Sequence, residues 1–229
     1  MSDINLKLKS ELIQYSRKLS EKQFVIGPGG NTSIRVGDFM YIKPSGLTFE
    51  DQTEADLVEV DLRTAKPTPG NKRRPSSEVL MHTYIYQTRP DVKCIFHAHP
   101  PITIGLMAGG AQFGHLYPDS VAYLGKKILV LDYIVPTTEK LANYVKENIK
   151  DHLTILLANH GVITVGENVK TTYLRMELME ALSYAIWIAK SSNPKCNVKF
   201  LTDSEIDEII NLDAEKYRTA LYEPEKKKN

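Results

Sequence analysis

Three histidines in this chain have the spacing of a metal site. His97 and His99 are separated by a single residue, and His160 lies much further along, in the segment Asn-His-Gly. If the apolar residues from Cys94 onward form a buried strand, His97 and His99 point to the same face, because strand side chains alternate with period two. Three protein ligands leave one coordination position open, which is the arrangement of a catalytic rather than a structural metal. The spacing is also compatible with two surface histidines and one hydrogen-bonded core histidine.

A carboxylate that could act as a base beside such a metal is Glu78, in the segment Pro-Ser-Ser-Glu. It lies in the first turn of a predicted helix, where a glutamate is common because it complements the helix dipole. Next to a metal with an open position, the same carboxylate could take a proton from a carbon made acidic by a metal-polarised carbonyl. His82 follows on the same helical face, and we interpret it as a residue that packs behind the site. His115 and His152 have no spacing relation to the three histidines, so we expect surface or core roles for them.

Three segments rich in glycine and hydroxyl groups are candidate phosphate-binding elements. The segment 27–33 (GPGGNTS) contains residues that tolerate unusual backbone angles and let backbone N–H groups approach a ligand. The segment 43–46 (KPSG) repeats the combination of hydroxyl and glycine. Ser76 and Ser77 stand at a predicted helix N-terminus, where free N–H groups favour an anion. An ordinary loop and a helix N-cap would account for the same residues, so the segments predict a phosphate pocket only if the fold brings them together.

The composition excludes several classes of protein. The chain has 229 residues, of which 42% are hydrophobic and 25% charged, as in soluble globular domains. A net charge of +1 provides no overall field for nucleic acid or an anionic membrane. Two cysteines are too few for a disulfide framework, and no apolar run resembles a signal peptide or reaches the length of a membrane span. We therefore expect a cytoplasmic protein with no nucleic-acid or membrane partner, in which Cys94 acts as a small buried hydrophobe.

The apolar periodicity predicts alternating helices and strands around one central sheet. Residues at helical spacing indicate a first helix over 3–19 and a longest helix over 168–192, and Thr202 with Glu205 forms a capping-box pattern at the start of the last helix. Further helices are predicted over 75–87, 100–109 and 138–150. Strands are predicted over 32–36, 39–43, 58–62, 94–99, 127–135, 152–159 and 162–165, the first two joined by a hairpin at Gly37, with a loop over 66–75. We expect a single α/β domain over 1–229, with a flexible basic tail at 220–229.

Five sequence blocks occur in a characteristic order along the chain: 27–34 (GPGGNTSI), 43–46 (KPSG), 75–78 (PSSE), 97–100 (HAHP) and 159–161 (NHG). Together they resemble the class II aldolase/epimerase family, the superfamily of L-fuculose-1-phosphate aldolase and L-ribulose-5-phosphate 4-epimerase. The resemblance covers nearly the whole chain. A coincidence of five blocks is far more specific than any one of them, and it favours the metal interpretation of the histidines.

The resemblance implies roles for individual residues. His97, His99 and His160 correspond to the zinc ligands, and Glu78 corresponds to the catalytic glutamate. It also implies a mostly antiparallel sheet with helices on both faces, and a cyclic homotetramer with active sites between neighbouring subunits. Because a His-rich site with a nearby carboxylate also accepts manganese, cobalt or iron, these metals remain alternatives to zinc. The positions that bind the substrate phosphate correspond to Asn31, Ser45, Gly46, Ser76 and Ser77.

The resemblance further implies a second acid/base at the aldehyde oxygen, supplied as a tyrosine by the neighbouring subunit. Tyr117 falls about where that tyrosine should, and Asp119 or Tyr123 could substitute for it. Tyr217 is a candidate for a residue near the C-terminus that closes the site. The pocket for the aldehyde half of the substrate is therefore the part of the site that the sequence specifies least.

We expect a zinc-dependent aldolase acting on a ketose 1-phosphate such as L-fuculose 1-phosphate. Zinc would act as a Lewis acid towards an enediolate, which Glu78 would protonate to give dihydroxyacetone phosphate and an aldehyde. A pentulose-5-phosphate 4-epimerase is the closest alternative, and dehydratases and decarboxylases share the histidine and glycine blocks. An interaction module resembling the adducin head region is the alternative outside enzymes, but the three histidines and Glu78 are all retained here.

Overall fold

The strands of the protein form one sheet through the centre of the molecule. We describe it from a computed structural model, in which residues 3–193, 195 and 197–222 are described. The strands are β1 (Asn31–Val36), β2 (Phe39–Ile42), β3 (Val58–Asp61), β4 (Lys66–Pro67), β5 (Cys94–Ala98), β6 (Leu129–Leu131), β7 (Thr154–Leu157) and β8 (Gly161–Gly166). Their order across the sheet is β4-β3-β2-β1-β5-β8-β7-β6. Adjacent strands pair antiparallel, except that β6 and β7 pair in parallel.

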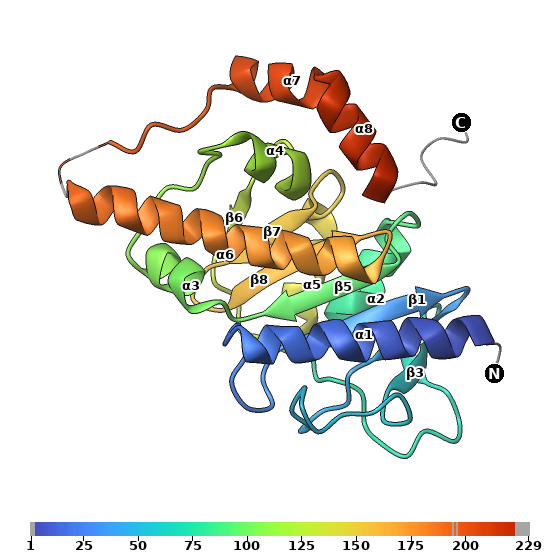
Figure 1. Cartoon of the computed structure of the whole chain (residues 1–229). Coiled ribbons are helices and arrows are strands. Elements are labelled where there is room, and N and C mark those ends of the chain that lie inside the picture. Colours follow the sequence, from blue (N-terminus) through green and yellow to red (C-terminus); the bar gives the residue numbers. More distant parts are fainter. Residues whose placement is uncertain (1–2, 194, 196, 223–229) are drawn as a thin grey trace.

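Helices cover both faces of this sheet (Figure 1). They are α1 (Asp3–Glu21), α2 (Val79–Thr88), α3 (Pro101–Ala108), α4 (Pro118–Leu124), α5 (Glu139–Asn148), α6 (Val169–Ser192), α7 (Asp203–Asn211) and α8 (Asp213–Tyr222). α1 and α6 lie side by side across one face, with α3 against α6, and α2 packs with α5 on the other face. α7 and α8 come after α6 in the chain, and α7 contacts α4. None of the helices in these described ranges is both long and apolar enough to span a membrane.

Each face of the sheet has its own hydrophobic core, and the alternation of side chains along β5 shows the division. Phe96 and Ala98 belong to the cluster under α1 and α6, whereas Ile95 belongs to the cluster under α2 and α5. Because strand side chains alternate, His97 points with Ile95 towards α2. β5 therefore places the His97 side chain close to the start of α2, which begins just after Glu78.

Capping residues in the sequence define where three of the helices begin. The side chain of Thr138 accepts a hydrogen bond from the N–H of Leu141 at the start of α5, and Asn168 accepts one from Thr171 at the start of α6. Thr202 forms the predicted capping box at the start of α7. These side chains satisfy N–H groups that have no partner inside the helix.

The fold class is the predicted one, a single α/β domain with a mostly antiparallel sheet and helices on both faces. The strand predicted over 127–135 is shorter, because only Leu129–Leu131 pairs with β7. The predicted loop over 66–75 contains the two-residue strand β4 at the sheet edge. α4 and α8 were not predicted. Most of the predicted basic tail, residues 223–229, lies outside the described residues.

Candidate metal centre and active site

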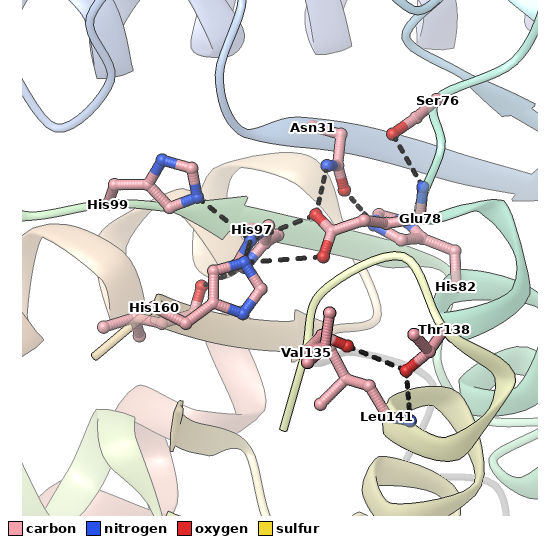
Figure 2. A network of polar contacts seen from close by, with 11 residues as sticks. Asn31, Ser76, Glu78, His82, His97, His99, Val135, Thr138, Leu141 and His160 are labelled. Carbon is pink, nitrogen blue, oxygen red and sulfur yellow. Dashed lines mark hydrogen bonds and ion pairs between the residues drawn. The ribbon is translucent and has the colours of Figure 1, made fainter. Parts of the chain in front are cut away.

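His97, His99 and His160 meet where β5 ends beside the turn between β7 and β8 (Figure 2). The Nε2 atom of His97 lies 3.2 Å from Nε2 of His99 and 3.2 Å from Nε2 of His160. One ligand atom from each of the three histidines lies within 4.8 Å of the others. A tetrahedral zinc ion with Zn–N bonds of about 2.0–2.1 Å requires N···N separations of about 3.3 Å. The three rings therefore fit a single divalent ion.

Local structure explains how each histidine reaches this point. His97 lies inside β5, and its Nδ1–H donates to the carbonyl oxygen of Val162 on β8 at 3.0 Å, which turns Nε2 towards the other two rings. The backbone N–H of His99 donates to the carbonyl oxygen of Phe24 at 2.8 Å. His160 follows Asn159, whose φ of 54° suits the tight turn, because asparagine tolerates the left-handed region better than most residues.

Two glycines allow the backbone to approach the histidines closely. A Cβ atom at Gly161 would lie 2.4 Å from the carbonyl oxygen of Ala98 and 2.7 Å from Cδ2 of His99. Gly30 has a φ of 59°, and a Cβ atom there would lie 2.9 Å from the carbonyl oxygen of His97. Only glycine fits these positions without displacing the backbone or the rings. The glycines of the sequence blocks thus shape the histidine cluster.

Burial and mutual repulsion keep two of the histidines neutral. Burial lowers the pKa of His99 to about 3 and that of His160 to about 4, and positive charge on His97 adds to the effect in both. Burial also acts to lower the pKa of His97, but the nearby carboxylate of Glu78 outweighs it and raises the pKa. Because a metal ion binds the neutral imidazole, His99 and His160 are available as ligands at neutral pH.

Glu78 brings a carboxylate against the histidines from the N-cap position of α2. Its Oε2 lies 3.2 Å from Nε2 of His97, and its Oε1 lies 3.5 Å from Nε2 of His160. Burial acts to raise the pKa of Glu78, but His97, His160 and a hydrogen bond from Asn31 together hold the pKa well below its usual range. The carboxylate is therefore ionised at neutral pH in a place where it can exchange a proton with a group bound beside the histidines.

A chain of polar side chains lies behind Glu78 (Figure 2). Nδ2 of Asn31 donates to Oε2 of Glu78 at 2.8 Å, and Oδ1 of Asn31 lies 2.6 Å from Nε2 of His82. Nδ1 of His82 lies 2.7 Å from Oγ of Ser33. His82 is fully buried and packs behind the site, as predicted. One amide hydrogen of Asn31 remains for the phosphate contact that the resemblance implies.

The three glycine- and hydroxyl-rich segments converge. The N–H of Ser45 donates to the carbonyl oxygen of Arg74, and the N–H of Ser76 donates to that of Lys43, both at 3.0 Å. The Lys43 ammonium donates to the carbonyl oxygen of Pro28 at 2.9 Å, which ties the glycine-rich turn to the other two segments. The fold therefore brings the three segments together, and their binding of a phosphate stays a prediction.

A cavity of about 480 Å³ opens beside these segments, and its walls include Ser45, Ser76, Ser77 and Arg74. Oγ of Ser76 accepts a hydrogen bond from the N–H of Glu78 at 3.2 Å, so its hydroxyl hydrogen can still be donated to a ligand. Gly46, which follows Ser45, has a φ of 81° that glycine adopts without strain.

Sequence reasoning missed two basic residues in this region, Lys43 and Arg74. Lys43 is only 2% exposed, and burial lowers its pKa to about 8, against the raising effect of Glu50. Arg74 is exposed at the wall of the cavity. The available signal was their place in the sequence, because each directly precedes the proline of a candidate phosphate segment.

The loop over residues 135–138 borders the other side of the site (Figure 2). Thr137 and Thr138 line a small cavity together with Ser77 and Glu78. Thr137 has a φ of 64°, which is uncommon for a β-branched residue. This loop is therefore held close to the carboxylate in a strained conformation.

The structure places Tyr117 at the N-cap of α4, half-buried against the core under α6. Burial raises the pKa of its phenol, and the charge of Asp119 adds to the effect. Arg218 of α8 lies 3.4 Å from Asp119, so α8, which carries the exposed Tyr217, is bridged to α4. The backbone carbonyl of Tyr123 accepts a hydrogen bond from Arg175. The role of Tyr117 in a site shared between subunits stays a prediction.

The remaining two histidines lie apart from this cluster. His115 is buried, with Nδ1 3.0 Å from Oγ of Ser120, and the carbonyl oxygen of His152 accepts a hydrogen bond from Arg89 at 3.1 Å. Cys94 is a buried free thiol within β5, and burial raises its pKa. Cys196 lies outside the described residues.

Known proteins share both the sequence and the fold. Residues 10–187 match the family described as "Class II Aldolase and Adducin N-terminal domain". The chain belongs to this family. The resemblance carried by the five blocks is thereby confirmed.

Relatives within the class II aldolase and adducin N-terminal domain family match this chain over most of their own length. An L-fuculose phosphate aldolase of Methanococcus maripaludis is 33% identical over 181 residues, which cover 78% of this chain and 96% of the relative. A 5-deoxy-D-ribulose 1-phosphate aldolase of Bacillus thuringiensis is 28% identical over 205 residues, which cover 89% of this chain and 93% of the relative. A solved structure of an L-fuculose 1-phosphate aldolase has a TM-score of 0.81 and 30% identity, covering 95% of this chain and 98% of its own. These family relatives support an aldolase-type enzyme.

Proposed function

We propose that this protein is a zinc-dependent aldolase that cleaves a ketose 1-phosphate to dihydroxyacetone phosphate and an aldehyde. The observation that carries the proposal is the position of Glu78, whose two carboxylate oxygens lie 3.2 Å and 3.5 Å from Nε2 atoms of two clustered histidines. The names of the relatives point to a deoxy sugar, either L-fuculose 1-phosphate or 5-deoxy-D-ribulose 1-phosphate. Three imidazole ligands favour zinc, with manganese, cobalt or iron as alternatives.

Different side chains have different roles in this reaction. A zinc ion on His97, His99 and His160 would supply Lewis-acid polarisation of the substrate carbonyl. In the condensation direction, the ionised Glu78 removes a proton from the hydroxymethyl carbon of dihydroxyacetone phosphate, and the electron pair of that C–H bond moves towards the carbonyl. In the cleavage direction the bond between C3 and C4 breaks, and the protonated Glu78 returns the proton to C3.

The second proton transfer takes place at the C4 oxygen. We assign it to Tyr117 of a neighbouring copy in a homotetramer, because the resemblance implies a tyrosine from the next subunit and Tyr117 is half-buried near the surface of its own protomer. A mobile proton is lost from the C4 hydroxyl in cleavage and returned to the aldehyde oxygen in condensation. The site would then be complete only between subunits.

We propose that several groups of the chain together bind the phosphate of the substrate. Ser45, Ser76 and Ser77 line one cavity, and Gly46 follows Ser45 in the chain. Asn31, which donates one amide hydrogen to Glu78, has a second one to donate. Arg74 adds a positive charge at the cavity wall. We propose that these groups hold the phosphate and thereby place the sugar carbonyl at the histidines. A buried free thiol at Cys94 is consistent with the cytoplasmic location that we propose.

The test is direct. Zinc-loaded protein is incubated with L-fuculose 1-phosphate and with 5-deoxy-D-ribulose 1-phosphate, and dihydroxyacetone phosphate is measured by coupled reduction, with the unphosphorylated sugars as controls. We expect product from at least one phosphorylated sugar and little from the controls. No product from any ketose 1-phosphate would overturn the proposal, and conversion of L-ribulose 5-phosphate to its C4 epimer without free aldehyde would favour the epimerase.

A further inference from the structure

α2 presents polar side chains to β1 at spacings that match. Glu78, His82 and Tyr86 are four residues apart, so they lie along one side of the helix. Asn31 and Ser33 are two residues apart on β1, so both point towards that helix. The five side chains form a single hydrogen-bonded file that leads from the core to the histidine cluster.

The carboxylate of Glu78, at the outer end of this file, determines which atom donates in each hydrogen bond of the file. The carboxylate of Glu78 can only accept, so Nδ2 of Asn31 donates to it at 2.8 Å. Asn31 thereby turns its Oδ1 towards His82, which must donate from Nε2 at 2.6 Å. With its single proton on Nε2, a neutral His82 accepts at Nδ1 from the hydroxyl of Ser33 at 2.7 Å.

Tyr86 closes the file at its inner end. Its hydroxyl lies 2.8 Å from Oγ of Ser33 and 3.1 Å from the carbonyl oxygen of the same residue. Since Oγ of Ser33 gives its proton to His82, the one hydroxyl proton of Tyr86 is shared between that Oγ and the carbonyl oxygen of Ser33. His82 and Tyr86 are almost completely buried, so bulk water does not compete for these bonds. Every donor in the file therefore points towards Glu78.

The two carboxylate oxygens of Glu78 differ as a result. Oε2 receives the hydrogen bond from Asn31. Oε1 is buried, and it accepts no hydrogen bond from any residue in the described part of the chain. A hydrogen bond stabilises negative charge on the oxygen that accepts it, so the oxygen without one is the better proton acceptor. The hydrogen bond from Asn31 holds one carboxylate oxygen on the side of β1, so the other oxygen is the one turned towards His160.

We infer that His82 is a positioning residue for proton transfer: acting through Asn31, it fixes Glu78 so that Oε1 exchanges the proton with the substrate carbon. The inference rests on the proposed function, because it takes Glu78 as the group that moves the proton. It gives Asn31 an orienting role in addition to the phosphate contact that the resemblance implies. It assigns His82, which touches neither substrate nor metal ligand in this arrangement, a measurable effect on turnover.

One measurement needs neither metal nor substrate. Long-range ¹⁵N–¹H spectra of the metal-free protein at neutral pH report which nitrogen of each histidine carries a proton, and the His82 signals are assigned by their loss in His82→Gln. We expect His82 as the neutral Nε2–H form, with that proton protected from solvent exchange. A proton on Nδ1 instead would reverse the file and overturn the inference.

A second measurement isolates the proton transfer from the unknown aldehyde. Zinc-loaded protein in D₂O should exchange one hydrogen of dihydroxyacetone phosphate, which proton NMR detects as loss of signal. Two variants form a matched pair: the amide of His82→Gln reaches the position of Nε2 and can donate to Asn31, whereas that of His82→Asn reaches only the position of Nδ1. We expect His82→Gln to retain most of the exchange rate and His82→Asn to lose about 10- to 100-fold in kcat, with KM and zinc content unchanged.

The outcomes separate the two proposals. No exchange by the wild type would overturn the proposed function and the inference with it. Exchange by the wild type with equal rates in both variants would overturn the inference alone. Thermal unfolding checks that each variant folds, and if His82→Asn does not, Ser33→Ala replaces it, because it removes the donor to Nδ1 while leaving the helix intact. The expected result is then a severalfold fall in kcat at constant KM, and an unchanged kcat would overturn the inference.

Discussion

Asn31 and His97 are direct partners in the antiparallel pairing of β1 with β5. Asn31 holds the carboxylate of Glu78 at 2.8 Å, and His97 lies 3.2 Å from each of the other two clustered histidines. Cα atoms of directly paired residues are only about 4.5–5.5 Å apart. One cross-strand pair therefore joins the candidate base to the candidate metal ligands, and the distance between them is set by the sheet itself.

Replacing Glu78 by glutamine should remove most of the proton transfer while the metal stays bound. The amide keeps the shape of the side chain but has no basic oxygen, so we expect hydrogen exchange into dihydroxyacetone phosphate to fall by about 10²- to 10⁴-fold. Zinc content should remain near that of the wild type, because the three histidines are unchanged. An exchange rate close to the wild-type value would identify another group as the base.

Adding a methyl group at Gly161 should damage the histidine cluster. The new Cβ would lie 2.4 Å from the carbonyl oxygen of Ala98 and 2.7 Å from the His99 ring, so Gly161→Ala should lose about 1–3 kcal/mol of stability and bind zinc more weakly. Gly105→Ala is the matched control, since a Cβ there meets nothing within 4 Å and lies in α3. Denaturant unfolding and zinc titration of both variants check this, and equal behaviour would contradict the steric argument.

Arg74 should contribute to the binding of the phosphate. Arg74→Ala removes a positive charge from the cavity wall and should raise KM for a ketose 1-phosphate by about tenfold, with little change in kcat. A rise of this size is expected for the loss of one hydrogen bond between charged groups. Arg63→Ala is the control, because Arg63 is exposed and paired with Asp61. If KM rises equally for the unphosphorylated sugar, Arg74 acts on something other than the phosphate.

A site shared between subunits should be restored by mixing two inactive variants. Glu78→Gln and Tyr117→Phe each remove one proposed proton carrier, and in a cyclic tetramer assembled from an equal mixture about a quarter of the sites combine an intact Glu78 with an intact Tyr117 from the next subunit. We expect aldolase activity to return after co-refolding and to be absent from either variant alone. Native mass spectrometry gives the subunit number, and no recovery in mixed tetramers would place both groups in one chain.

The metal-free protein should lose stability in acid through His82. Burial and the charge of His97 lower its pKa to about 3, against the raising effect of Glu78. An unfolded histidine has a pKa of about 6.5, so between that value and pH 3 the unfolded chain binds a proton that the folded protein does not, and stability falls as the pH is lowered.

Between pH 7 and pH 5, His82 alone should lower the free energy of unfolding by about 2 kcal/mol. Urea unfolding of the wild type and of His82→Gln at the two pH values measures it, and the drop should be smaller in the variant by that amount. An equal drop in both proteins would assign the acid sensitivity to other residues.

The parts of the structure that depend on local patterns were predictable from the sequence. Alternation along the strand gave the direction of His97 within β5, and capping residues such as Thr202 marked helix starts. The predicted strand extended to His99, but β5 ends at Ala98, so His99 reaches the cluster from just beyond the strand. The contact of Asn31 with Glu78 and His82 was not predictable, because it depends on how α2 packs against β1. Local spacing says which residues share a side of one element, whereas tertiary packing decides which sides meet.

His97 pairs with Ile163 across β5 and β8. The histidine cluster therefore forms only when these two strands pair in the correct register. A slip of one residue between these strands would turn the histidine to the opposite face and break its alignment with the turn that carries His160. An ion that requires all three imidazoles would bind only to chains whose central strands have paired correctly. The number of zinc ions bound per chain after refolding would therefore count correctly assembled molecules, independently of any enzyme assay.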